Sequence, residues 1–181
     1  MKVITNKVRI NYPNLFEPKM VELSNEKRYS VVILIPKSDI QTIEKIKEAI
    51  KLEKNKLLEN FKNIDLDEIK LPLRDGDIEK CDIKEYENHY FINAISKYKP
   101  GIVDKKLNKI DDEKEIYPGC YVRASINFYY FNKAGQVGIG CGINNIQKLA
   151  DGEYIHINSR PEDDFSIIED DLEDLLTWFY P

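Results

Sequence analysis

The chain lacks the features that mark several classes of protein. No apolar run is long enough to span a bilayer, and the first ten residues contain no apolar signal core, which predicts a cytoplasmic protein without membrane contact. Only three cysteines are present, widely spaced and without a paired-cysteine metal motif, which favours reduced, mostly buried thiols. A serine elbow, a phosphate-binding glycine loop and a cysteine–histidine pair are all missing, so the sequence predicts no enzyme and no cofactor.

Acidic residues form one local cluster, but it does not match a known metal site. Asp75, Asp77, Glu79 and Asp82 lack the ligand order of an EF-hand and its glycine at the sixth position. The two histidines have no ligand partner at a recognisable spacing. We therefore expect a solvated turn and no bound metal, with a metal-dependent nuclease built on this cluster as the alternative.

The charges are segregated along the chain. All 27 Lys and Arg lie at or before Arg160, whereas eight of the 32 Asp and Glu lie in the last twenty residues. Residues 1–161 hold 27 basic against 24 acidic side chains, a net charge of +3. This asymmetry predicts a mildly basic domain over residues 1–160 and an acidic interaction tail over residues 161–181.

Hydrophobic periodicity predicts a mainly antiparallel α+β domain. One long helix is expected near residues 38–61, with Ser38 and Gln41 as a capping box and an apolar face that includes Ile43, Ile46 and Ile50. Strands are expected at residues 3–10, 29–35, 90–96, 102–103, 121–131, 137–143 and 154–157. Several strands with one capped helix between them favour a barrel.

The hairpin predicted within residues 117–149 carries the most informative pattern. From Tyr121 to Phe131 apolar side chains occupy every second position, as in a strand with one core face. A turn at residues 132–135 and a return strand follow. We expect a four-residue loop that pairs Phe128 with Ile139, because a slip of one residue would place glycines opposite the core side chains.

The other face of this hairpin is the predicted binding surface. It combines aromatic rings and a cation with a row of glycines, and a second aromatic–basic segment ends the strand at residues 90–96. Rings stack on unpaired bases and cations contact phosphates. Two alternatives stay open: a helix or second sheet covers the glycines, or the face is a protein-interaction or dimer surface. The predicted nucleic-acid-binding residues are Lys97, Tyr98, Lys99, Tyr121, Arg123, Tyr129, Phe131, Gly138, Gly140 and Gly142.

The acidic tail has two interpretations. Its apolar residues could pack on the domain as a terminal amphipathic helix, or the segment could be a mobile anionic peptide that occupies the basic groove and contacts partner proteins. The residues expected to matter are Asp170, Asp171, Glu173, Asp174, Trp178 and Phe179.

Several segments resemble a known family. They are VRINYPNLFEPK (8–19), YSVVILIPKSD (29–39), PLRDGD (72–77), HYFINAISKYKPGIVD (89–104), IYPGCYVRASINFYYFNKAGQVGIGCGINNIQKL (116–149) and RPEDDF (160–165). In this order they look like a family of phage and prophage proteins that is grouped with phage single-stranded-DNA-binding proteins.

The resemblance implies an OB-fold-like domain that coats single-stranded DNA during phage replication and recombination. Related proteins end in an acidic tail with a terminal aromatic residue, whereas this chain ends Phe179-Tyr180-Pro181. We therefore predict a non-enzymatic, sequence-tolerant single-stranded-DNA-binding protein in the bacterial host cell. Replication or recombination proteins could bind its tail, and a homodimer stays open.

Overall fold

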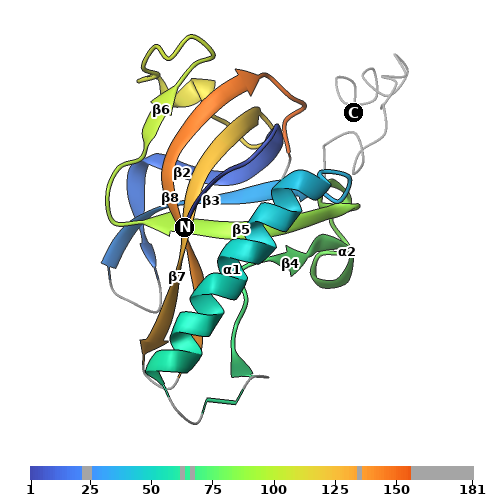
Figure 1. Cartoon of the computed structure of the whole chain (residues 1–181). Helices are drawn as coiled ribbons and strands as arrows, with labels where there is room; N and C mark the ends of the chain where they lie inside the picture. The colour runs from blue at the N-terminus through green and yellow to red at the C-terminus, as the bar shows by residue number, and fades with distance from the viewer. Residues whose placement is uncertain (22–25, 62–63, 66–67, 134–135, 156–181) are drawn as a thin grey trace, which may run out of the picture.

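The computed structural model describes residues 1–21, 26–61, 64–65, 68–133 and 136–155 (Figure 1). The described elements, in chain order, are β1 (Lys2–Ile4), β2 (Val8–Val21), β3 (Glu26–Pro36), α1 (Ile40–Asn60), β4 (Arg74–Asp75), α2 (Gly76–Glu79), η2 (Lys84–Tyr86), β5 (His89–Ser96), β6 (Gly101–Val103), η3 (Glu113–Glu115), β7 (Tyr121–Lys133) and β8 (Gln136–Ala150). No helix in this part of the chain has the length and apolar character needed to cross a bilayer.

Five strands close into a barrel. Neighbouring strands follow the order β7-β2-β3-β5-β8, and β8 pairs again with β7. Within this ring only β5 and β8 run parallel. A closed five-stranded barrel of this kind is the OB-fold, in which the second and third strands form the usual ligand face. The predicted mainly antiparallel, OB-fold-like α+β architecture is confirmed, and β3 and β5 are its second and third strands.

Alternation along each strand fills the barrel. Val31 and Ile33 of β3, Ala94 of β5, and Val122 and Ile126 of β7 are almost completely buried. Their neighbours in sequence point to the outer face, because successive side chains of a strand point to opposite sides. The predicted core parity of the hairpin is therefore correct.

Helix α1 lies between β3 and β5 in sequence and packs against β1, β7 and β8 (Figure 1). Ile43, Ile46 and Ile50 are buried, as predicted. The predicted Ser38 cap is wrong: Asp39 is the N-cap and accepts a hydrogen bond from the Thr42 backbone N–H at 3.2 Å. Ser38 cannot be the cap because the helix begins at Ile40, one residue later than a Ser38 cap requires.

The first predicted strand is also corrected. The chain forms β1, leaves the sheet at residues 5–7 and continues as β2 far beyond the expected turn at residues 11–14. Tyr12 has φ of 47°, and the pairing of β2 with β3 shifts between Asn11 and Asn14. The turn residues therefore make a bulge within the strand. The last predicted strand is absent at Tyr154 and Ile155, and residues 156–157 lie outside the described part.

The central hairpin is longer than predicted and its register differs by two residues. Lys133 pairs with Gln136, and Phe128 pairs with Cys141 instead of Ile139. A shift of two keeps every side chain on its predicted face, since the period of a strand is two. The tail residues Asp170, Asp171, Glu173, Asp174, Trp178 and Phe179 lie outside the described residues.

Candidate nucleic-acid interface

A row of outward-facing residues crosses the sheet at the ligand face of the barrel. Ser30 of β3 lies opposite Ile95 of β5, Ile95 opposite Gly142 of β8, and Gly142 opposite Asn127 of β7. Their sequence neighbours Val31, Ala94, Cys141 and Ile126 point into the barrel. The outer face is therefore continuous from the second barrel strand to the central hairpin.

Three members of this row, Ile95, Gly142 and Asn127, line an open groove with a volume of about 600 Å³. One wall comes from β3 and the end of β5, and the other comes from β7. The described residues that line it are Arg28, Ile95, Ser96, Lys97, Tyr98, Asn127, Tyr129, Phe131, Gly142, Ile143 and Asn144. No carboxylate is among them, and helix α1 packs against the apolar face of the hairpin, as the contact of Phe61 with Tyr130 shows. The alternative in which a helix covers the glycines is thus wrong for the described residues.

The rings of the groove lie across glycines. Tyr129 is opposite Gly140, and Phe131 is opposite Gly138. A Cβ atom at Gly140 would lie 2.6 Å from the Tyr129 ring, and one at Gly138 would lie 2.9 Å from the Phe131 ring. Any larger residue would displace these rings, because real Cβ contacts are not this short. The glycines therefore hold the rings flat against the sheet.

This arrangement changes the predicted role of the three glycines, which was to let a bound strand approach a bare surface. Gly138 and Gly142 are buried, and Gly140 is half-buried. Besides the Phe131 ring, the Lys70 carbonyl lies 2.7 Å from the Cβ position of Gly138, and the Asn127 side chain covers Gly142. The glycines support the candidate surface from beneath, and the side chains above them form it.

The aromatic side chains differ in exposure. Tyr98 is 82% exposed, whereas Tyr129 is 37% exposed and Phe131 is half-buried. Burial raises the pKa of the Tyr129 hydroxyl, so this ring carries no negative charge at neutral pH. The groove thus offers one fully accessible ring and two rings fixed against the sheet.

Two cations at the groove share one carboxylate. Arg28 forms an ion pair with Glu26, and Lys97 Nζ lies 3.7 Å from the same Glu26 carboxylate. Glu26 is at the start of β3, and its side chain is half exposed. Exposed ion pairs of this kind contribute only about 0.2–1 kcal/mol, so a polyanion can compete for both cations.

Five of the ten predicted residues do not line the groove: Gly138 and Gly140 lie beneath its rings, and the other three lie elsewhere. Tyr121 and Arg123 are at the opposite end of β7, where Tyr121 contacts Lys7 and Arg9. Lys99 lies with its Nζ 5.5 Å from the centre of the Phe16 ring and does not line the groove. Alternation predicts the face of a side chain correctly but not its position along a strand of 13 residues.

Six lining residues were missed by the sequence reasoning: Arg28, Ile95, Ser96, Asn127, Ile143 and Asn144. Asn127 shares the parity of Tyr129, and Ile95 lies two residues before Lys97. Both could have been found by extending the alternation along the two strands. Arg28 could have been found from the OB-fold resemblance, since it lies on the second barrel strand.

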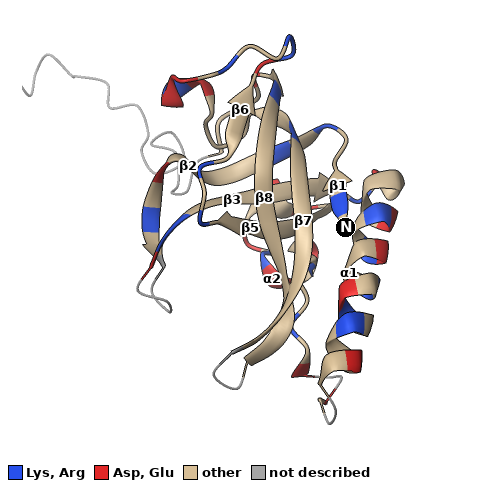
Figure 2. Ribbon diagram, turned by 60° about the vertical axis from the view of Figure 1, so that its left-hand side comes forward, with Lys and Arg blue, Asp and Glu red and all other residues tan. Residues whose placement is uncertain are grey.

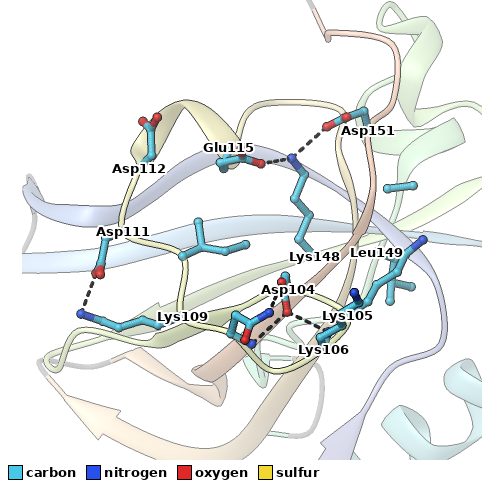
Figure 3. A pocket seen from close by; sticks show the side chains of 13 residues that line it. Asp104, Lys105, Lys106, Lys109, Asp111, Asp112, Glu115, Lys148, Leu149 and Asp151 are labelled. Atoms are coloured by element: carbon cyan, nitrogen blue, oxygen red, sulfur yellow. Dashed lines mark hydrogen bonds and ion pairs between the residues drawn. The ribbon is translucent and has the colours of Figure 1, made fainter.

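A second hollow, of about 730 Å³, lies beside the end of β8 (Figure 3). Its charges neutralise one another: Lys148 Nζ lies 2.6 Å from Glu115 and 2.9 Å from Asp151. Although burial acts in the other direction, the hydrogen bonds to these carboxylates raise the pKa of Lys148. Lys109 pairs with Asp111 at 2.6 Å. Because five carboxylates lie among four lysines, this larger hollow does not suit an anion.

Three of the four carboxylates in the acidic cluster of residues 75–82 are paired with cations in the same way. Lys37 Nζ lies 2.7 Å from both Asp75 and Asp77, and Arg74 pairs with Glu79. The hydrogen bond from Lys37 lowers the pKa of Asp77. In the described residues no group of three His, Cys, Asp or Glu is arranged to hold a metal ion.

The fold and the groove define a small OB-fold barrel with an aromatic and basic ligand face. A family model described as "Enterobacter phage Enc34, ssDNA-binding protein" matches residues 1–176, and the chain belongs to this family. A relative from Acyrthosiphon pisum secondary endosymbiont phage 1, named protein p50, is 31% identical over 163 residues. That match covers 84% of this chain and 85% of p50.

The chain is also similar to solved structures of phage single-stranded DNA-binding proteins. The single-stranded DNA-binding protein from bacteriophage Enc34, in complex with ssDNA, is 26% identical with a TM-score of 0.74, over 86% of this chain and 89% of that chain. The single-stranded DNA-binding protein gp2.5 of bacteriophage T7 is 12% identical with a TM-score of 0.62, over 92% of this chain and 98% of that chain. The second likeness shows the fold alone.

Proposed function

We propose that this chain binds single-stranded DNA in the groove between β3, β5 and the β7–β8 hairpin, without sequence preference and without catalysis. The observation that carries the proposal is the groove itself, which places exposed rings and two cations on the ligand face of an OB-fold. Family membership and the likeness to a protein solved with ssDNA support it.

In this proposal the bases stack on Tyr98, Tyr129 and Phe131, and the phosphates contact Arg28 and Lys97. Each stacked ring contributes about 1–3 kcal/mol whatever the base, because every base has an aromatic face. Lys99, beside Phe16, would meet a strand that continues past the end of β5. The phosphates displace Glu26 from its two cations.

The acidic tail, residues 161–181, competes for this groove. Ile155 is the last described residue and is buried against Leu34 and Phe91, which lie on the outer face of β3 and β5. The described part of the chain therefore ends on the same outer face as the groove. In the proposal the eight carboxylates that follow in sequence compete at the high effective concentration of a tethered group. The acidic and aromatic residues of the tail, Asp170 to Phe179, contact replication or recombination proteins of the phage in the cytoplasm of the host.

A titration of intrinsic Tyr and Trp fluorescence with oligo-dT of increasing length tests the proposal. Stacking is expected to quench emission, and log affinity is expected to fall linearly with log salt. Removal of residues 162–181 is expected to tighten binding at low salt. An absence of binding to every oligonucleotide at low salt would overturn the proposal, and an unchanged affinity of the truncated chain would overturn the role of the tail. A parallel series with oligo-rU measures the preference for DNA over RNA.

A further inference from the structure

A second basic surface lies at the end of β7 that is far from the groove. Val8 pairs with Val122 and Arg9 with Tyr121, and both valines are completely buried in the barrel. Arg9 of β2 and Tyr121 and Arg123 of β7 therefore point outward from two neighbouring strands. Lys7 directly precedes β2 and lies over the Tyr121 ring. We call these four residues the basic patch.

The cations of the basic patch surround Tyr121. Lys7 Nζ lies 4.6 Å and Arg9 Cζ lies 5.7 Å from the centre of its ring. Arg9 donates to the carbonyls of Gly119 and Glu153, at 3.2 and 2.6 Å, and Arg123 donates to the Thr5 carbonyl at 3.3 Å. These bonds orient the guanidinium groups through neutral carbonyl oxygens.

In the described part of the chain, the cations of the basic patch contact backbone carbonyls and the Tyr121 ring. None of its three cations is in an ion pair there. Like charges on neighbouring strands repel, and this costs stability. Elsewhere in the molecule, at Lys37 and Lys148, cations are paired with carboxylates. A surface that keeps repelling cations in fixed positions is suited to an external anion.

The patch is connected to the groove along one face of the sheet. From Tyr129 to Arg123 the outward residues of β7 are Asn127 and Ser125, and Lys2 of β1 lies opposite Asn127. Strands β7 and β8 contain no Asp or Glu, and Figure 2 shows the acidic residues concentrated on other elements. Six residues of strand span about 20 Å, a distance that a few nucleotides can cover.

We propose that the basic patch is a second contact surface for the phosphate backbone of the same DNA strand, which leaves the groove and runs along β7. This inference rests on the proposed function. It predicts two classes of ligand: short oligonucleotides that occupy only the groove, and longer ones that also reach the patch. The patch contributes affinity to the second class alone.

The test uses the full chain and compares wild type with the double variant Lys7→Ala/Arg123→Ala. Oligo-dT of about 5 nucleotides and of about 16 nucleotides spans the site sizes of OB-folds. We expect the variant to bind the short oligonucleotide as wild type does and the long one several-fold more weakly. For the long one, the slope of log affinity against log salt falls in magnitude by about 1.4, because two phosphate contacts are lost.

The matched control is Lys45→Ala/Lys51→Ala, which removes two exposed cations from α1 and is expected to leave both affinities unchanged. Equal affinity and salt slope of wild type and the patch variant for the long oligonucleotide would overturn the inference. Tighter binding of the patch variant would also overturn it, because the patch would then hold the acidic tail. If wild type bound neither oligonucleotide, the proposed function itself would fail.

Discussion

Two hollows lie along β8, one beside its middle residues and one beside its end, and they differ in how their charges are used. In the larger hollow lysines and carboxylates pair with one another. In the groove no carboxylate lines the surface, and the rings face solvent above a glycine floor. The larger hollow pairs its lysines with carboxylates of its own lining, whereas the two cations at the groove share the single carboxylate of Glu26. The two hollows therefore differ in how much of their positive charge is balanced internally.

The largest expected effect comes from removing two rings of the groove together. In Tyr98→Ala/Tyr129→Ala each lost stacking interaction is expected to weaken binding by about 5- to 150-fold, from roughly 1–3 kcal/mol per base. Affinity for oligo-dT at fixed salt measures the effect. Leu107→Ala, at the edge of the other hollow and 72% exposed, is the control and should bind as wild type does. If the double variant had the same binding isotherm as wild type, these rings would not contact the DNA.

Tyr98→Ala alone separates binding from folding. This side chain is 82% exposed, so its removal should leave the midpoint of thermal unfolding unchanged while weakening binding. Tyr129 covers Gly140, so its substitution can affect stability as well. A loss of affinity in the single variant with an unaltered unfolding curve assigns the effect to stacking.

Comparing two pairs of cations sharpens the contrast between the hollows. Arg28→Ala/Lys97→Ala is expected to weaken binding by about tenfold at low salt and to reduce the magnitude of the salt slope by about 1.4. Lys105→Ala/Lys106→Ala removes the same charge from the edge of the other hollow. Its salt slope should equal that of wild type. Equal slopes for both variants would mean that only the net charge matters.

The sequence predicted the faces of the hairpin but not its register or reach. Alternation fixes parity, and a shift of two residues preserves it, so Phe128 could be paired with Ile139 or with Cys141 at the same face. The same limit explains why Tyr121 and Arg123 were grouped with Tyr129. The outward-facing residues alternate along all of β7, whereas the groove includes only those from Asn127 to Phe131.

Features that depend on distant segments could not be predicted locally. Whether Asp75 and Asp77 are free or paired depends on Lys37, which comes from the end of β3 and is nearly forty residues away. The turn-like residues around Tyr12 became a bulge because β2 continues its pairing with β3 on both sides. In both cases tertiary pairing determined the outcome, whereas the long helix and the core strands followed from their own periodicity.

A smaller effect is expected from a methyl group beneath a ring. In Gly140→Ala the new Cβ would lie 2.6 Å from the Tyr129 ring, which must move away from the sheet. We expect several-fold weaker binding of oligo-dT by a folded protein. Gly101→Ala is the matched control, because its Cβ would lie 2.6 Å from the Asn145 side chain, outside the groove. Equal affinities of the two variants would show that the position of the Tyr129 ring does not matter.

The smallest effect concerns the carboxylate that the DNA must displace. Glu26→Gln removes the negative charge shared by Arg28 and Lys97, so both cations meet phosphates without first losing a partner. An exposed ion pair contributes about 0.2–1 kcal/mol, which corresponds to binding that is about 1.5- to 5-fold tighter. Glu115→Gln removes the carboxylate beside Lys148 in the other hollow and should leave the affinity unchanged. If Glu26→Gln weakened binding instead, Glu26 would act by holding the two cations in place for the DNA, and the groove would be organised by its one acidic neighbour.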